Sequence, residues 1–303
     1  MTMASFSFDT DKLGPLLRET TQILTDAGHD APALDARLLL CHACEVSYEM
    51  LLADPDRQTS DAQIALLTEF TQRRLDHEPV SRIMGYRAFW KHDFKINHAT
   101  LDPRPDTETL IEATLDYVDG EKGRNFPFKI LDLGTGSGCI LLSLLSELPN
   151  ATGVGVDISE EALEIAGHNA DEISVFDQVR FIKSNWLDSV NGAFDIIVSN
   201  PPYIVQEDIQ ALMRDVRDYD PYTALDGGQD GLDAYRIIIN QIAQSPEFKQ
   251  SWIIFEIGDG QAEDVQNLLK NHISQSFFDI NSKADLSGRL RCVSARFENT
   301  AQL

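Results

Sequence analysis

From Lys129 to the end of the chain, short apolar strands alternate with helical segments, and this alternation limits the fold more than any other feature. The expected strands cover residues 129–133, 153–157, 179–182, 194–199 and 252–256. Strands that alternate with helices form a largely parallel sheet. The last two expected strands, 277–280 and 290–297, have no helix-length segment between them and should pair as an antiparallel hairpin at the sheet edge. The sequence therefore predicts an α/β fold.

The first 80 residues have helical periodicity instead. From Asp9 to Gly28, one helical face carries Leu13, Leu16, Leu17, Thr20 and Leu24. Pro32 opens a second helix, and Ser60 with Gln63 has the form of a capping box at the start of a third. No catalytic constellation appears in this region. We therefore expect residues 1–80 to form a small helical domain that binds or positions a substrate.

Residues 81–104 differ from both flanking regions. Their aromatic and β-branched residues predict a β-hairpin with its turn at 91–93. Asp106 is expected to cap the first helix of a third region, residues 105–303, which contains the sheet. The hairpin is either a linker between two domains or part of the entrance to a site. In the second case Arg104 and Glu108 are candidate polar contacts.

The charge is strongly negative and unevenly distributed. The formal net charge is −24, with −8 in residues 1–80, +3 in residues 81–104 and −19 in residues 105–303. Such acidity repels phosphate backbones, so we expect no direct nucleic-acid partner. It would attract a basic protein partner, although it can equally serve solubility alone.

Targeting and metal-binding signals are weak. No apolar run approaches the ~20 residues that span a bilayer, and the N-terminus lacks a basic, then apolar, signal-peptide pattern. A cytoplasmic protein without a membrane partner is the expectation. The Cys41-His42-Ala43-Cys44 spacing has no second ligand pair, so we predict two helix residues and no metal site.

A glycine-rich turn follows the first expected strand of the sheet. Its residues are Gly134, Thr135, Gly136, Ser137 and Gly138, and Asp157 ends the next strand 23 positions after Gly134. This spacing fits a turn that approaches a nucleoside cofactor and an acid that accepts hydrogen bonds from ribose hydroxyls. Asp132 would repel a pyrophosphate but favour a cation, so S-adenosylmethionine fits better than NAD. Trp186 is either a stacking partner for adenine or an aromatic residue at the core edge.

The segment Asn200-Pro201-Pro202-Tyr203 follows the fourth expected strand. The prolines lack N–H groups, so the backbone offers carbonyl oxygens, and Asn200 adds a side-chain oxygen. A planar group with N–H donors could lie on the Tyr203 ring and point its hydrogens at these acceptors. The alternative is a turn that only closes a strand.

Taken together, the two motifs resemble class I S-adenosylmethionine-dependent methyltransferases, and specifically the protein glutamine N5-methyltransferases that act on bacterial release factors. The resemblance covers nearly the whole chain. It includes the segments 85–90, 103–108, 225–232 and 256–261. It implies a Rossmann-like methyltransferase sheet, preceded by the helical domain and the β-hairpin linker. Near the C-terminus, where the family tends to have Gly-Arg-Asp-Arg, this chain has Gly288-Arg289-Leu290-Arg291, and we assign no role there.

The resemblance also implies roles for residues. Gly134 to Gly138 would bind the methionine part of the cofactor, Asp157 its ribose and Trp186 its adenine region. Asn200 would contact both cofactor and substrate, and Pro201, Pro202 and Tyr203 would surround the substrate glutamine. In this family that glutamine belongs to the Gly-Gly-Gln motif of class I peptide-chain release factors. The expected enzyme is a monomer that takes a release factor as its protein substrate.

The amide nitrogen of glutamine is a poor nucleophile, and Asn200, Pro201 and Tyr203 are predicted to activate and position it. Acceptors on both N–H groups of an amide would localise its lone pair toward the methyl group, and water could take the proton that is released. A ribosomal-protein glutamine and the N6 amine of adenine remain alternative acceptors. Adenine would require basic surface for phosphates, which the charge disfavours. A cofactor-binding protein without catalytic activity would leave the complete acceptor motif unused.

Overall fold

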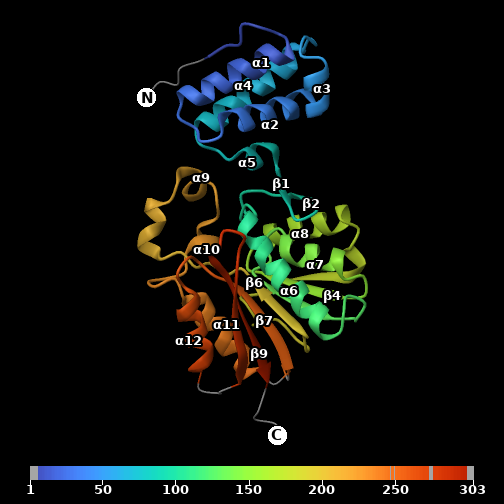
Figure 1. The fold of residues 1–303 in the computed structure, drawn as a ribbon, viewed down its shortest axis with the longest axis vertical. Helices are drawn as coiled ribbons and strands as arrows, with labels where there is room; N and C mark the ends of the chain where they lie inside the picture. The colour runs from blue at the N-terminus through green and yellow to red at the C-terminus, as the bar shows by residue number, and fades with distance from the viewer. Residues whose placement is uncertain (1–5, 246, 249, 273–275, 299–303) are drawn as a thin grey trace. The chain divides into compact units, whose positions relative to one another are not determined.

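The computed structural model describes residues 6–245, 247–248, 250–272 and 276–298. The chain divides after Gly85 into two compact units. The N-terminal unit consists of helices, whereas the second unit contains the sheet (Figure 1), and each has a hydrophobic core of its own.

The N-terminal unit is helical, as predicted. It contains α1 (Leu13–Asp26), α2 (Pro32–Cys44), α3 (Tyr48–Ala53), α4 (Asp61–Leu75) and α5 (Val80–Met84). The expected face of α1 is buried, except that Leu17 is only partly so. Pro32 is the first residue of α2, and the capping box at Ser60 is formed by reciprocal hydrogen bonds with Gln63.

The second unit begins with the expected hairpin, in which β1 (Tyr86–Phe89) pairs antiparallel with β2 (His92–Lys95). The turn lies at Trp90 and Lys91, one position earlier than predicted, because His92 and Asp93 pair with Phe89 and Ala88. Trp90 takes the left-handed backbone conformation that the tight turn requires, with φ of 54°.

The prediction that Asp106 caps a helix is wrong. Asp106 lies within a 3-10 turn, η1 (Pro105–Thr107), which leads directly into α6 (Glu108–Glu121). Its carboxylate pairs with Arg291, at 2.7 Å, instead of with helix N–H groups. The first residues of this segment are thereby tied to the far end of the chain.

A seven-stranded sheet forms the centre of the second unit. The strands are β3 (Lys129–Leu133), β4 (Thr152–Asp157), β5 (Val179–Lys183), β6 (Ile196–Ser199), β7 (Gln250–Glu256), β8 (Phe277–Ala284) and β9 (Leu290–Glu298). Their order is β5-β4-β3-β6-β7-β9-β8. The first five are parallel, and β9 is antiparallel to both β7 and β8. The predicted C-terminal hairpin is confirmed, with β8 at the edge.

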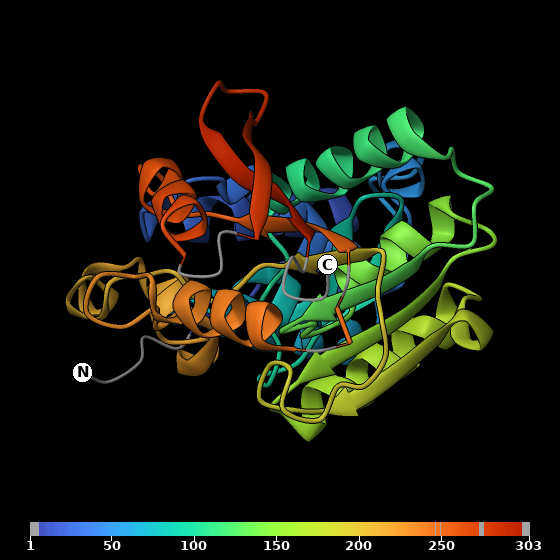
Figure 2. The same ribbon diagram turned by 90° about the horizontal axis from the view of Figure 1, so that it is seen from below.

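Helices cover both faces of the sheet (Figure 2). On one face, side chains such as Ile130, Val198 and Ile254 pack with α6, α7 (Cys139–Glu147) and α8 (Glu160–Glu172). On the other face, Leu131 and Phe255 pack with α11 (Asp233–Gln244) and α12 (Ala262–Lys270). The alternation follows from the two-residue period of a strand buried on both sides.

The remaining short elements are η2 (Phe176–Gln178), η3 (Gln206–Ala211), α9 (Arg214–Arg217) and α10 (Tyr222–Leu225). The chain order reverses between β3 and β6, which makes their carboxyl ends a topological switch point, where open α/β sheets bind ligands. Within the described part of the chain, every helix is too short or too polar to cross a bilayer.

Candidate active site

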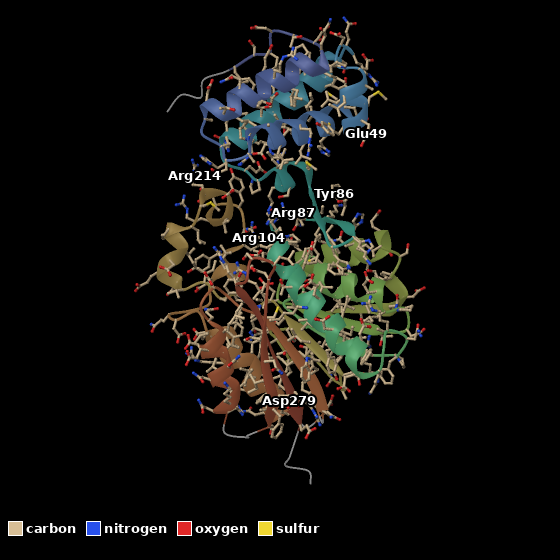
Figure 3. All side chains as sticks on the ribbon, in the orientation of Figure 1. Glu49, Tyr86, Arg87, Arg104, Arg214 and Asp279 are labelled. Carbon is tan, nitrogen blue, oxygen red and sulfur yellow. The ribbon has the colours of Figure 1, made fainter. Side chains whose placement is uncertain are left out.

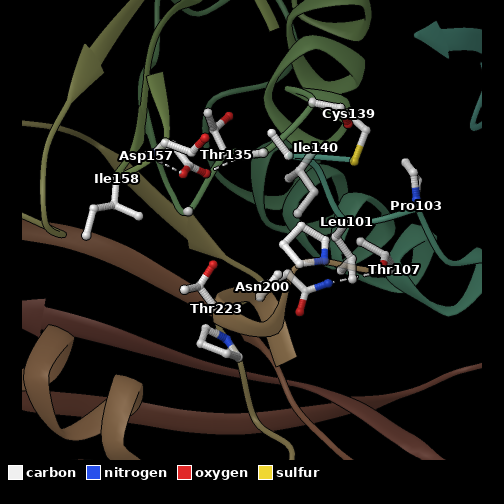
Figure 4. Close-up of a pocket in the computed structure, with 18 of the residues that line it drawn as sticks. Leu101, Pro103, Thr107, Thr135, Cys139, Ile140, Asp157, Ile158, Asn200 and Thr223 are labelled. Carbon is white, nitrogen blue, oxygen red and sulfur yellow. Dashed lines mark hydrogen bonds between the residues drawn. The ribbon is translucent and has the colours of Figure 1, made fainter. Parts of the chain in front are cut away.

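A cavity of about 270 Å³ lies at the carboxyl ends of β3, β4 and β6 (Figure 4). Its walls come from the glycine turn, the ends of β4 and β5, the start of the acceptor segment, and the chain around η1 and α10. The sequence-predicted residues among its lining are Gly134, Thr135, Gly136, Ser137, Asp157, Trp186, Asn200 and Pro202. Residues predicted from separate motifs therefore meet in one cavity. Gly138, Pro201 and Tyr203 do not line it.

The glycine turn takes a conformation that other residues rarely adopt. Gly134, Gly136 and Gly138 have φ values of 75°, 54° and 81°. The backbone N–H groups of Gly134 and Thr135 donate to the Val156 carbonyl, which fixes the turn to β4. Gly138 is the N-cap of α7 although it has no side chain to cap with. At Gly134 and Gly136 the turn therefore presents backbone, without side-chain bulk, to the cavity.

Asp132 is completely buried beneath this turn. Its Oδ2 accepts a 2.6 Å hydrogen bond from the Thr135 hydroxyl, whereas Oδ1 has no hydrogen-bond partner in the described chain. Burial raises the pKa of Asp132 to about 7, with the nearby Asp157 adding to the rise and Thr135 opposing it. The Leu141 backbone N–H also opposes the rise in this pKa, and an ionised carboxylate beneath the turn would favour a cationic ligand. This fits the ammonium and sulfonium charges of S-adenosylmethionine.

Asp157 connects the end of β4 to the glycine turn. Its Oδ2 accepts from the Gly136 N–H and its Oδ1 from the Ser159 N–H, both at 2.9 Å. Burial raises the pKa of Asp157, and these two backbone hydrogen bonds oppose the shift. A carboxylate has about four acceptor positions, so two remain for ribose hydroxyls. The exposed Ile158 and the partly buried Trp186 provide apolar surface in the same cavity.

One residue that supports the turn was not predicted. Asn169, buried in α8, donates to the Ser137 carbonyl at 2.9 Å and exchanges hydrogen bonds with the backbone of Lys95 in β2. All its hydrogen-bonding groups are directed at backbone. It thereby ties the hairpin and the cofactor turn to one helix. In sequence it is an ordinary polar residue within a helical pattern.

The acceptor segment divides between the cavity and the protein interior. The Asn200 side chain lines the cavity, and its Nδ2 donates to the Thr107 hydroxyl at 3.3 Å (Figure 4). Its Oδ1 therefore remains available as an acceptor. The Tyr203 ring packs against the core between the sheet and α11–α12. Burial raises the pKa of Tyr203 well above its usual value, so the phenol stays neutral and cannot serve as a base near neutral pH.

Two later segments hold this acceptor segment from behind. Gly227 lies so close that an added Cβ would be 2.8 Å from backbone atoms of Tyr203. Gln261 donates to the Tyr203 carbonyl at 3.0 Å and accepts from the Gly258 N–H at 2.9 Å. Ile204 exchanges backbone hydrogen bonds with Leu225 and Gly227. The glycine-rich segments 226–231 and 256–261 thus fix the backbone position of Tyr203.

A second buried carboxyl group lies behind the acceptor segment. Glu256, the last residue of β7, is completely buried, and its Oε1 accepts from the Tyr203 hydroxyl at 3.4 Å. Burial raises the pKa of Glu256 to about 7, whereas hydrogen bonding from Thr107 and Tyr203 opposes the rise. Its Oε2 has no hydrogen bond of regular geometry in the described residues. The signal in the sequence is an acid that ends an otherwise apolar strand.

Only one of the two candidate entrance residues lines the cavity. Arg104 lines it and pairs with the buried Asp220. Glu108 instead accepts from the Trp90 N–H at 2.9 Å and so supports the hairpin turn. Figure 3 shows Arg104 and Arg87 at one end of the second unit and Asp279 at the opposite end. Cys139 also lines the cavity, but burial raises its pKa to about 12, which excludes a reactive thiolate.

The two cysteines of the N-terminal unit are free thiols on α2. Cys44 is buried and Cys41 half-buried, and burial raises the pKa of Cys44 to about 11. These are the properties of helix residues that contribute to packing, as the sequence predicted.

Comparison with known proteins identifies the family. Residues 15–85 match the model of the PrmC N-terminal domain, and residues 117–217 match the methyltransferase small domain. The release factor glutamine methyltransferase of Rhodospirillum rubrum is 44% identical over 286 residues, which are 94% of this chain and 85% of that protein. The corresponding protein of Bradyrhizobium diazoefficiens is 43% identical, with 90% of this chain and 91% of that protein covered.

The chain belongs to the release factor glutamine methyltransferase family. The predicted family, enzyme class and S-adenosylmethionine cofactor are thereby confirmed. Among solved structures, the hMettl16 catalytic domain matches with a TM-score of 0.51 and 14% identity, over 69% of this chain and 76% of that chain. A methyltransferase from Pyrococcus furiosus matches with a TM-score of 0.50 and 16% identity, over 76% of this chain and 99% of that chain. At these identities the structures confirm the methyltransferase fold alone.

Proposed function

We propose that this protein transfers the methyl group of S-adenosylmethionine to the side-chain amide nitrogen of a glutamine in a class I peptide-chain release factor. The observation that carries the proposal is the position of Asn200. It lines the same cavity as the glycine turn and directs its Nδ2 away to Thr107, which leaves Oδ1 as an acceptor. The names of the relatives support the release factor as the protein substrate.

The cofactor would be held by the glycine turn, Asp157 and the apolar surface of Ile158 and Trp186. When bound, S-adenosylmethionine supplies a methyl group on a sulfonium sulfur, which keeps the electron pair of the carbon–sulfur bond as the glutamine nitrogen forms its bond to the methyl carbon. Asp132, buried beneath the turn, would favour the cationic ligand through its charge when it is ionised.

The acceptor residues would act on the substrate amide. Asn200 Oδ1 and the Pro201 carbonyl would accept its two N–H hydrogens and so raise electron density on nitrogen. The half-buried Tyr203 ring, behind the cavity wall, would restrict the amide plane. Since charge builds up on this nitrogen during the transfer, fixed acceptors stabilise the transition state more than the ground state. The methylated amide then loses one proton to water, and the neutral Tyr203 takes no part in that step.

Docking of the protein substrate is assigned to the N-terminal helical unit and the hairpin. Residues 81–104 are the one net-basic region between two acidic ones, and the helical unit has its own core. Deletion of residues 1–80 should raise the KM for the release factor and leave the Kd for S-adenosylmethionine unchanged. An unchanged KM for the release factor would refute the docking role of the helical unit. We further propose that the enzyme acts as a monomer, and a substrate that acts in translation supports a cytoplasmic location.

The test is a competition among acceptors with methyl-labelled S-adenosylmethionine. A release factor, a ribosomal protein and an oligonucleotide are offered at equal concentration. Label should appear on the release factor and should be lost when the glutamine of its Gly-Gly-Gln motif is replaced by alanine. Label on the ribosomal protein alone would show that the substrate is a ribosomal protein instead of a release factor. Label on nucleic acid alone would overturn the proposal.

A further inference from the structure

We propose that Thr107 and Glu256 are positioning residues that set the direction of the Asn200 amide, so that its oxygen and not its nitrogen faces the acceptor. The inference rests on the proposed function for its substrate. It concerns, however, any acceptor that presents N–H groups to Asn200. The three residues come from η1, the end of β6 and the end of β7.

The oxygen and the NH2 group of an asparagine amide are nearly equal in size, and only the oxygen can accept a hydrogen bond from the substrate. If the amide turned by 180°, Nδ2 would face the substrate and two donors would meet. The hydrogen bond from Asn200 Nδ2 to Thr107 Oγ1, at 3.3 Å, holds the productive orientation (Figure 4). Thr107 is 2% exposed, so water does not compete for this contact.

Thr107 alone cannot enforce this orientation. A hydroxyl group both donates and accepts, so it could equally donate to Asn200 Oδ1 in the turned state. The orientation of the Asn200 amide is set only if the Thr107 hydroxyl donates its proton to a fixed acceptor. The neighbouring Glu256 provides one, because an ionised carboxylate accepts hydrogen bonds and donates none. Thr107 hydrogen bonding lowers the pKa of Glu256, as expected for a donor beside a carboxylate.

Glu256 is also linked to Tyr203. The Tyr203 hydroxyl donates to Oε1 at 3.4 Å, whereas the buried Oε2 makes no hydrogen bond of regular geometry in the described residues. We assign Oε2 as the acceptor toward which the Thr107 proton is directed. One carboxylate thus orients both sides of the acceptor site. It orients Asn200 through Thr107, and it anchors the Tyr203 ring directly.

The same arrangement makes the amide direction dependent on the ionisation of Glu256. A protonated Glu256 can donate to Thr107, and the Thr107 proton is then free to favour the turned Asn200. Burial raises the pKa of Glu256 to about 7. The titratable and charged groups around it come from η1, α7, the segment after β6, α11 and β9, and are Asp106, Cys139, Tyr203, Tyr235, Arg291 and Cys292. The pKa values of the thiols and phenols are all raised by burial, so these groups stay neutral near pH 7.

The experiment compares Thr107→Val, Thr107→Ser and the control Thr114→Val. Valine keeps the shape of threonine without the hydroxyl, and Thr114 is a buried threonine of α6 that donates to the Leu110 carbonyl away from the cavity. We expect Thr107→Val to lower kcat by about 10- to 100-fold with an unchanged Kd for S-adenosylmethionine. Thr107→Ser should recover most of the rate, and Thr114→Val should keep the wild-type kcat.

A second measurement uses pH and does not depend on the stability of the threonine variants. At saturating cofactor, the wild-type kcat should rise with pH through about 7, as Glu256 ionises. Glu256→Gln should lower kcat and remove this step. The Kd for S-adenosylmethionine is measured at each pH, because Asp132 also titrates near 7 and belongs to the cofactor side.

Two results would overturn the inference: wild-type kcat in Thr107→Val, or an unaltered pH step in Glu256→Gln. Its failure differs from a failure of the proposed function. If wild-type protein labels adenine and not glutamine, the substrate assignment falls. The Thr107 and Glu256 variants would then be assayed with adenine as the methyl acceptor, and the same two results would test the inference.

Discussion

The cofactor half of the site (Asp132, residues 134–138, Asp157 and Trp186) and its acceptor half (residues 200–203, Thr107 and Glu256) each contain one fully buried carboxyl group. Asp132 is held by Thr135, three positions away. Glu256 contacts Tyr203, 53 positions away, and Asn200 depends on Thr107, 93 positions away. The cofactor half is therefore built mainly from β3, β4 and the turn and helix that join or follow them, and the acceptor half by contacts between segments much farther apart in sequence. Changes in one half should be measurable without loss of the other.

The largest expected effect is in Asn200→Ala. Removal of one fixed acceptor from a site of developing charge typically costs about 100- to 1,000-fold in rate. We expect a loss of that order in single-turnover kcat, with only a moderately weaker Kd for S-adenosylmethionine. Full activity would refute the assignment of Asn200, and a complete loss of cofactor binding would show that the two halves are not separable.

A smaller loss is expected from Gly227→Ala, which changes the acceptor half from behind. The added Cβ would lie 2.8 Å from backbone atoms of Tyr203 and Gly231, and backbone cannot move aside cheaply. A displacement of about 1 Å at the acceptor segment can cost about 100-fold in kcat. Gly167→Ala is the matched control, since nothing lies within 4 Å of its added Cβ on α8. Equal kcat values for the two variants would contradict the support that we assign to Gly227.

The converse change is Asp157→Ala in the cofactor half. It removes a carboxylate that fixes the Gly136 N–H at 2.9 Å and that we assign to the ribose. Charged hydrogen bonds contribute about 1.5–3 kcal/mol, so the Kd for S-adenosylmethionine should rise by about 10- to 100-fold. At saturating cofactor, kcat should remain near the wild-type value. A fall in kcat without a change in Kd would contradict the division into halves.

The smallest expected effect is on stability. Burial raises the pKa values of Asp132 and Glu256 to about 7, from 3.8 and 4.5. Because the folded pKa is higher, each group contributes stability that is fully present below about pH 4 and is lost as pH rises through about 7. Asp132→Asn and Glu256→Gln should therefore stabilise the protein at pH 8 relative to pH 5, by on the order of 1–2 kcal/mol each. Urea unfolding at both pH values measures this, and a stabilisation that is equal at both would exclude ionisation as its cause.

The difference between the halves also explains which parts of the fold and the site could be predicted from the sequence alone. The glycine turn, Asp157, the capping box at Ser60 and the sheet strands depend on residues close in sequence, and their local structure forms as predicted. The pairing of Thr107 with Asn200 and the burial of Glu256 beside Tyr203 require the folded sheet. For the same reason Asp106 was misassigned as a cap, because its partner Arg291 lies in the last strand.

The most direct test of the account is the position of the transferred methyl group. The protein is incubated with a release factor and S-adenosylmethionine that carries a trideuterated methyl group, and the product is mapped by tandem mass spectrometry. The account predicts the label on the side-chain amide nitrogen of the Gly-Gly-Gln glutamine, with a yield that falls about 100-fold or more in Asn200→Ala. Label on a lysine or on the backbone, or a yield independent of Asn200, would contradict it.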